Sequence, residues 1–535
     1  MIHKLIPYKT GIILILFMAV ACSVNLGKAV HIDDTAYLQI AKAILVSPLH
    51  PLSQKIMWGN TARPIFVINQ PLLIPYIYAI LIKLFGPSEL ILHLFMALCS
   101  SLVILFFYIL VNSFHVRYPL FLTGLFSLGP SFLPGQNLMV DIPLIVSWLV
   151  FFWAILSTEG EDRKYLLAGI AVSIACLIKY TSLVLLPVFL IVIIYRRHWR
   201  GLWGFGIILL TLLLWSIFNY YDFGAIHLLG RPTVSLTPQT VFYRLISWIC
   251  GIGSIAPFII SFISLKRDDL RDRNWIMVSI LCSILLGLFM IFTDQTTFAI
   301  YWIPFFIIGL FLNGFAVSLL KENITVAWRD ADKNALVEEI VLGLWIVGTS
   351  AFIILFSPFI AIRHILLVMP PFLILLGRHL TRQGIVIWRD VLSFSLTILL
   401  GIALAISDYT YANVYRHYAY SIKQDLPSNE RVYEVGFWGW AWYSTKAGML
   451  QYDMKQSSLQ ADDYLVIPTN ISKQRISKDD LSRLNRIRDL QIPAPWTTWI
   501  RTMYGGGYYS FAFPLSPPWR FSKAPFEFEI YQVDR

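Results

Sequence analysis

Residues 10–44 read TGIILILFMAVACSVNLGKAVHIDDTAYLQIAKAI, and they place two adjacent carboxylates, Asp33 and Asp34, directly after a long apolar stretch. A stretch of this length can cross a hydrocarbon core of about 30 Å as a helix, and we count about thirteen such stretches between residues 10 and 407. The sequence therefore predicts a polytopic helical membrane protein with an acid pair at the edge of the membrane.

The composition excludes an ordinary soluble globular protein. Hydrophobic residues make up 57% of the 535 residues and charged residues only 14%, and the mean hydropathy is +0.67. The net charge of +11 would suit nucleic acid or anionic lipid, but much of the Lys and Arg lies in short loops between apolar stretches. We therefore expect no nucleic-acid partner and assign this charge to membrane topology.

The basic loops predict the orientation, because Lys and Arg accumulate on the cytoplasmic face. The loops that alternate with them, such as GQNLMVD at 135–141 and TDQTTF at 293–298, carry almost no basic residues. An odd number of spans then places the N-terminus in the cytoplasm and everything after about Asp408 outside it. The basic positions used are Lys4, Lys9, Arg163, Lys164, Arg196, Arg197, Arg200, Lys266, Arg267, Arg271, Arg273, Lys321, Arg329, Lys333, Arg378 and Arg382.

Residues 71–86 are the ambiguous stretch. They are short and contain Pro71, Pro75 and Lys83, so we predict a juxtamembrane helix within a first outer loop over about residues 31–87. Counting this stretch as a span would invert every later loop against the distribution of basic residues.

The chain changes character at about residue 409, where the apolar runs give way to a mixed pattern. RVYEVGFW at 431–438 and YLVIPT at 464–469 are typical of strands, FEFEIYQV at 526–533 of an edge strand, and KDDLSRLNRIRDL at 478–490 of an amphipathic helix. We therefore divide the chain into a membrane domain, 1–408, and a small extracytoplasmic α/β domain, 409–535.

The acid pair and the residues after it carry the first resemblance to a known family. The chain resembles the GT-C membrane glycosyltransferases, in particular the protein O-mannosyltransferase and lipid A aminoarabinose transferase group, which has an Asp-Glu pair followed by Thr, a basic residue and Tyr. The corresponding residues here are Asp33, Asp34, Thr35, Ala36 and Tyr37. Asp34 stands where Glu is usual, and Ala36 stands where a basic residue often helps to hold the donor phosphate.

Other motifs follow in the order expected of this group. They are NQP at 69–71, LIKLFG with Lys83, MVDIPL with Asp141, CLIKYTSLVLLP with Lys179, and IRHILLVMPPFLILLG with Arg363 and His364. The resemblance implies a GT-C catalytic domain in a bacterial inner membrane.

The same resemblance implies an inverting transfer of a hexose or pentose from a polyprenyl-phosphate carrier to an acceptor hydroxyl at the extracytoplasmic face. A carboxylate at the membrane edge can take the proton of the hydroxyl, and we expect Asp33 to be this base while Asp34 orients the acceptor or a metal ion. The acceptor is a protein, a lipid or a glycan, and membrane lipid surrounds the spans. The plain alternative for both acids is capping of the helix that follows them.

The departing phosphate needs cations rather than a strong acid. The candidates are Lys83, Lys179 and Arg363, with Asp141, Tyr37 and His364 expected to orient the acceptor or a metal ion. Ionisable residues near bilayer depth favour a functional role for Lys179 and Arg363. No cofactor is certain, although Asp33, Asp34 and Asp141 offer the oxygen ligands that a divalent ion prefers.

Two other functions fit the same composition. A transporter or flippase also has many spans and intramembrane charges, but the long acidic first outer loop, the lack of repeated halves and the outer domain oppose it. An inactive relative that only binds lipid-linked sugar is the other alternative, which the departure at Ala36 leaves open.

Overall fold

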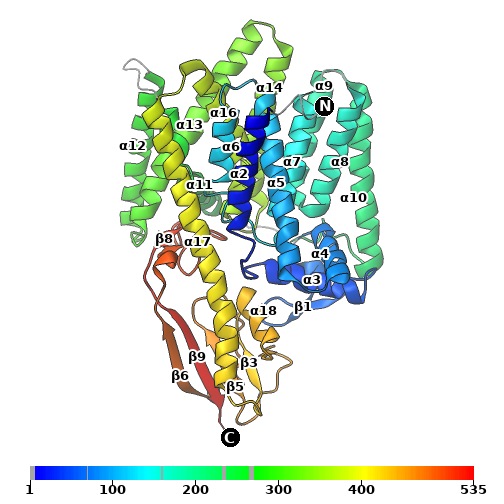
Figure 1. Ribbon diagram of the computed structural model, residues 1–535, viewed down its shortest axis with the longest axis vertical. Helices are drawn as coiled ribbons and strands as arrows, with labels where there is room; N and C mark the ends of the chain where they lie inside the picture. Colours follow the sequence, from blue (N-terminus) through cyan, green and yellow to red (C-terminus); the bar gives the residue numbers. More distant parts are fainter. Residues whose placement is uncertain (1–6, 69, 158–160, 232–235, 264–269, 535) are drawn as a thin grey trace.

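A helical bundle with a small sheet at one end forms the protein in the computed structural model (Figure 1), which describes residues 7–68, 70–157, 161–231, 236–263 and 270–534. Asn69 and the basic residues Lys4, Lys266 and Arg267 lie outside the described residues.

Six of the described helices are long and apolar enough to cross a membrane, judged by length and composition. On α10 and α12 many large apolar side chains, such as Leu213 and Leu281, point away from the protein, as lipid-facing residues do. The prediction of a helical membrane protein is therefore confirmed, without the number of spans. These six helices are α5 (Glu89–Ser113), α10 (Leu202–Phe223), α12 (Leu270–Phe292), α13 (Ala299–Arg329), α14 (Lys333–Phe356) and α17 (Ile387–Asp425).

Shorter helices complete the bundle, and the count of about thirteen spans stays a prediction. Pro119 and Pro238 begin two of them, at the position where the missing N–H of proline costs nothing. The shorter helices are α2 (Tyr8–Ser23), α6 (Pro119–Ser127), α7 (Asp141–Leu156), α8 (Asp162–Ile178), α9 (Leu185–Tyr195), α11 (Pro238–Ser254), α15 (Ile362–Ile365) and α16 (Met369–Gln383).

The segment after α2 forms two short helices and a hairpin. Helix α3 (Asp34–Val46) packs against α4 (Leu73–Phe85). In the chain between these helices, β1 (Lys55–Met57) pairs antiparallel with β2 (Ala62–Pro64). The 13 residues of α4 span only about 20 Å, too little for a hydrocarbon core. The short helix expected within 71–86 is therefore present, at the end of the bundle that also carries the C-terminal sheet (Figure 1).

The C-terminal sheet has five strands in the order β4-β3-β5-β9-β6. Strand β3 is parallel to β4 and β5, while β9 is antiparallel to β5 and β6. Helix α18, which carries the buried Trp440 and Tyr443, follows β3. The strands are β3 (Val432–Glu434), β4 (Leu450–Gln451), β5 (Tyr464–Pro468), β6 (Leu484–Ile492) and β9 (Phe526–Val533), and α18 covers Trp438–Lys446.

Two expectations for this region are wrong. The helix expected over 478–490 is limited to α19 (Lys478–Ser482), and β6 follows it. Strand β9 is an inner strand because β6 pairs with it along its whole length. The backbone groups of β9 need partners on both sides, and this pairing outweighs the helical spacing of the Leu and Ile residues.

The C-terminal residues are part of the bundle as well as of the sheet. Helix α17 continues for 39 residues through the boundary expected at 408/409. Farther along, the Phe511 N–H donates to the Ile360 carbonyl, the Phe513 N–H to Ser247 Oγ and the Tyr508 hydroxyl to the Pro130 carbonyl. Residues 508–513 therefore pack between the helices. A short pair of strands, β7 (Ile500–Arg501) and β8 (Arg520–Phe521), flanks this inserted segment.

Candidate active site

One face of the acid-containing segment lines a cavity of about 580 Å³. Asp33, Ala36, Tyr37 and Ile40 all contribute to the lining, and their spacing of three, four and seven residues places them on one side of α3. Asp33 occupies the N-cap position of α3, but its side chain makes no capping hydrogen bond. Capping of α3 therefore does not explain the presence of an acidic side chain at position 33.

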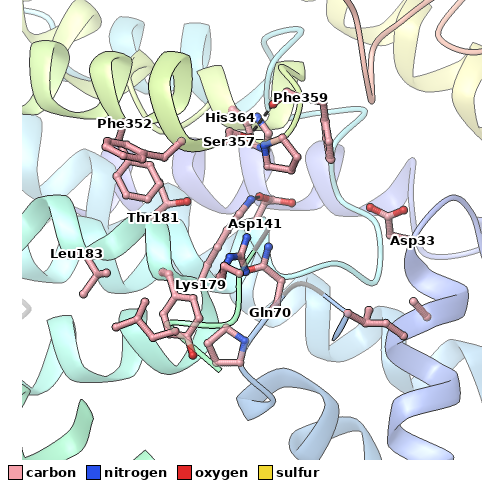
Figure 2. Close-up of a pocket in the computed structure, with 18 of the residues that line it drawn as sticks. Asp33, Gln70, Asp141, Lys179, Thr181, Leu183, Phe352, Ser357, Phe359 and His364 are labelled. Atoms are coloured by element: carbon pink, nitrogen blue, oxygen red, sulfur yellow. Dashed lines mark hydrogen bonds and ion pairs between the residues drawn. The ribbon is translucent and has the colours of Figure 1, made fainter. Parts of the chain in front are cut away.

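The other walls come from segments far apart in the sequence. They are the residues from Gln70 to the start of α4, the start of α7, the junction of α8 and α9, the residues after α10, and the chain from the end of α14 to α15. Figure 2 shows Asp141 and Lys179 near the middle of the site, Asp33 on one side, and Leu183 and Phe352 on the other.

The polar part of the cavity is a chain of alternating charges. Arg363 Nη2 donates to Asp33 Oδ2 over 2.8 Å, and Arg363 Nε lies 3.8 Å from Asp141 Oδ2. Lys179 Nζ donates to the other oxygen, Asp141 Oδ1, over 2.8 Å. Asp33 is the most accessible of the four, with 24% of its side chain exposed. Asp141, Lys179 and Arg363 are buried, so their charges depend on one another.

The structure separates the two adjacent acids. Asp34 is fully buried at 0% exposure and does not line the cavity, and its Oδ2 accepts a hydrogen bond from the His31 N–H over 2.9 Å. Burial raises the pKa of Asp34 well above its usual range, which favours the neutral acid. Asp33 faces the cavity while Asp34 faces the protein interior.

The remaining expected residues divide in the same way. Tyr37 and His364 line the cavity. Nδ1 of His364 is buried without a hydrogen bond. Lys83 is exposed in the last turn of α4 and does not line the cavity. We therefore leave Lys83 out of the site.

Arg231 is a cavity residue that the sequence analysis missed. It follows α10, and its guanidinium lies 5.6 Å from the centre of the Tyr180 ring, which also lines the cavity. The sequence feature that could have identified Arg231 is that it is a single Arg in a loop expected to be poor in basic residues. Arg231 adds a third cation to Lys179 and Arg363.

A metal ion does not fit the acids as they are arranged. Across the described residues, no three His, Cys, Asp or Glu side chains converge in a way that could hold an ion. Arg363 lies between Asp33 and Asp141, and Asp34 points elsewhere. The guanidinium thus already occupies the place between the two carboxylates that a divalent ion would bridge.

The opposite part of the cavity is apolar and partly open. Leu183, Phe352 and Leu355 form walls, while Leu229 and Leu236 also line the cavity and are 79% and 52% exposed. Leu229 and Leu236 both follow α10 in the chain, the helix on which many apolar side chains are exposed.

A second buried polar cluster lies behind the acid-containing segment. Asp408 of α17 accepts hydrogen bonds from Lys28 Nζ over 2.5 Å and from the Tyr509 hydroxyl. His31, two residues before Asp33, has its Nε2 3.4 Å from Asp408 Oδ1, and Asn137 binds both Lys28 and Tyr509. The cluster joins the segment before α3 to the C-terminal residues.

Comparisons with known proteins give several similar solved structures and one matching family model. A search among curated proteins finds no match. Among solved structures, the protein is similar to ArnT from Cupriavidus metallidurans bound to undecaprenyl phosphate, at 16% identity and a TM-score of 0.42, over 89% of this chain and 96% of that one. It is similar to the oligosaccharyltransferase AglB from Archaeoglobus fulgidus, at 12% identity and a TM-score of 0.46, over 86% of this chain and 69% of that one.

A third similar structure is the Saccharomyces cerevisiae protein O-mannosyltransferase complex Pmt1-Pmt2, at 15% identity and a TM-score of 0.30, over 41% of this chain and 34% of that one. In the sequence itself, a family model matches residues 69–221, which include Asp141 and Lys179. The resemblance to the protein O-mannosyltransferase group is confirmed over these residues, which match the family described as dolichyl-phosphate-mannose-protein mannosyltransferase.

Proposed function

We propose that the protein transfers a sugar from a polyprenyl-phosphate carrier to an acceptor hydroxyl, with inversion, in the cavity that Asp33 lines. The observation that carries this proposal is the joining, in one cavity, of an accessible carboxylate, three cations and an apolar opening. Each of the three matches one part of the substrates: the hydroxyl proton, the phosphate and the hydrocarbon tail.

Asp33 is the proposed base because it is the accessible carboxylate of the polar chain. The acceptor hydroxyl gives its proton to Asp33 while its oxygen attacks the anomeric carbon of the sugar. The bond from this carbon to the phosphate oxygen breaks, and the electron pair leaves with the polyprenyl phosphate. Attack on the side opposite the leaving group inverts the anomeric centre.

The cations are the proposed phosphate ligands. Arg363 and Lys179 are held by Asp33 and Asp141, and Arg231 lies on the side of Tyr180. A phosphate that enters between them would receive charge-assisted hydrogen bonds that strengthen as negative charge develops on the leaving oxygen. The first isoprene units of the tail would then lie along the leucines of the opening.

The extracytoplasmic location of the cavity is also proposed, from the distribution of charge. Trp302, near the start of α13, donates to the Pro514 carbonyl, and the N–H of nearby Phe511 donates to the Ile360 carbonyl, next to the cavity residue Phe359. The 31 residues of α13 then extend about 46 Å, and the basic residues Arg329 and Lys333 lie at the far end. The positive-inside rule assigns that far end to the cytoplasm.

Neighbouring acids allow a matched test. Purified protein in lipid nanodiscs is supplied with polyprenyl-phosphate sugars of several kinds and candidate acceptors, and loss of lipid-linked sugar is followed. We expect Asp33→Asn to lower turnover by about a hundredfold or more and Asp34→Asn, which keeps an oxygen for the His31 N–H, to retain most of it. Equal activity of both variants and wild type would exclude Asp33 as the base.

Two further measurements separate the other two functions. Binding of lipid-linked sugar to the nanodisc protein without turnover, across all donors and acceptors, would indicate a binding protein. In sealed vesicles, movement of the intact donor between leaflets, unaffected by Asp33→Asn, would indicate a flippase.

A further inference from the structure

The segment 496–523 carries a group of exposed apolar side chains outside the candidate active site. Trp496 and Leu515 are each 75% exposed and Phe521 is 60% exposed, while Trp499, directly before β7, is 37% exposed. We propose that this group, Trp496, Trp499, Leu515 and Phe521, is a membrane-binding surface that inserts into the lipid interface beside α12 and α13.

Contacts with the helix ends place this surface at the edge of the apolar band. The Phe521 N–H donates to the Tyr301 hydroxyl over 3.1 Å, and Phe513, two residues before Leu515, packs against Phe289 with ring centres 6.4 Å apart. Tyr301 lies near the start of α13 and Phe289 near the end of α12. Figure 1 shows β8 at the level where α12 ends, between the bundle and the five-stranded sheet.

The neighbouring ends of these helices are themselves lipid-facing. Phe292, the last residue of α12, and Ile300, the second of α13, are among the most exposed apolar side chains of the protein. The window of α12 that is apolar enough to span a membrane is only 22% buried. Leu515 and Phe521 therefore continue an apolar surface that already faces lipid.

Two cations flank the surface in the manner of interfacial residues. Lys523 Nζ lies 4.2 Å from the centre of the Trp499 ring, and the Arg520 guanidinium lies 5.1 Å from that of Phe298. Trp residues and Lys or Arg side chains gather at the headgroup level of a bilayer, where the rings sit in the interface and the charges reach phosphate. This combination of side chains favours a lipid surface over a protein partner.

Site-directed spin labels test this surface in the complete protein. Leu515→Cys and Phe521→Cys are made in a background with the five native cysteines replaced by alanine, labelled with a nitroxide, and reconstituted in nanodiscs containing anionic lipid. Ile284→Cys on the exposed face of α12 is the lipid control, and Ser428→Cys, exposed after α17, is the water control. The measured quantity is the ratio of collision rates with oxygen, which prefers lipid, and with a water-soluble nickel chelate.

We expect the labels at 515 and 521 to give ratios several-fold higher than the label at 428 and closer to that at 284. A ratio equal to that at 428 would overturn the proposal, as would immobilised labels that exclude both reagents, since a protein contact would then cover the surface. A phospholipid with a photoreactive group near its headgroup gives an independent result with the unmodified protein. Crosslinks to peptides of 496–523 are expected, and their absence beside strong crosslinks to α12 would contradict the proposal.

Discussion

Arg363 joins two acids that lie far apart in the chain. Its Nη2 atom donates a hydrogen bond to Asp33 Oδ2 over 2.8 Å, across 330 residues of sequence, and its Nε atom lies 3.8 Å from Asp141 Oδ2. A planar guanidinium can serve two carboxylates in this way, whereas an ammonium is a single point of charge. Arg363 therefore connects the segment before α3 to the start of α7.

Arg363→Lys should keep the charge and lose this geometry. We expect turnover to fall by about a hundredfold, because the ammonium cannot hold Asp33 and bind the departing phosphate from one position. Steady-state kinetics in nanodiscs measure the effect. The control is Arg382→Lys, because Arg382 lies in the last turn of α16 and does not line the cavity. Full activity of Arg363→Lys would show that the two-carboxylate arrangement is not needed.

Lys179→Met should weaken binding of the carrier lipid. Removing one charge-assisted contact to phosphate is expected to raise the Kd for undecaprenyl phosphate by about tenfold. Lys83→Met is the matched control, since Lys83 is exposed and outside the cavity. Because Asp141 loses its nearer cation and keeps only Arg363 at 3.8 Å, the double variant Lys179→Met with Asp141→Asn is measured as well. If binding weakened in Lys83→Met and not in Lys179→Met, then Lys83 and not Lys179 would be the phosphate ligand.

Chelation of divalent metal should leave turnover unchanged. Arg363 already lies between Asp33 and Asp141, so we expect equal rates in EDTA and in Mg²⁺ or Mn²⁺. The measurement is turnover after dialysis against EDTA. Loss of activity that Mn²⁺ restores would show that the carboxylates rearrange around an ion.

Much of the site was predictable from short patterns. The acid pair before a helix, Asp141 at a helix start, and Lys179 after an apolar stretch are all local features, and the structure brings Asp33, Asp141, Lys179 and Arg363 together. Their order along the chain matched a family pattern. Which of Asp33 and Asp34 faces the cavity depends instead on the rotation of α3 against its neighbours, which the pair alone does not specify.

Other features depend on contacts that no local pattern contains. Lys83 is a cation in the expected first outer loop, as a phosphate ligand would be. However, α4 packs on α3 in a way that leaves Lys83 exposed. Arg231 enters the cavity only because the chain after α10 folds back toward Tyr180. Strand β6 forms because β9 offers an open edge. In each case a distant partner decides the outcome.

The buried cluster around Asp408 should contribute to stability. Asp408→Asn leaves Lys28 without its carboxylate in a site where both are buried, and breaking such a pair costs about 3–5 kcal/mol. We expect a clearly lower temperature of unfolding for Asp408→Asn and a smaller loss when Lys28→Met is added. Intrinsic fluorescence during heating measures both. A double variant as unstable as the single one would show that the charge pair is not the cause.

Glu434 in β3 gives a prediction for pH. Its side chain is fully buried, and burial raises its pKa well above the ordinary value of 4.5, which the nearby Gln451 and Trp440 side chains only partly offset. Below pH 4.5 the folded and unfolded states both hold the proton. As the pH rises, the unfolded chain releases it first, so stability falls until the pH passes the pKa of the folded state.

Glu434→Gln cannot ionise and should avoid this loss. We expect the variant to be equal to or less stable than wild type at pH 4, and more stable at pH 8, with about 1.4 kcal/mol gained for each pKa unit between the folded and unfolded carboxyl. The measurement is the temperature of unfolding from pH 4 to 8, with Glu430→Gln as a control that should show no such trend. A difference between Glu434→Gln and wild type that does not grow with pH would mean that Glu434 ionises in the folded protein as readily as in water.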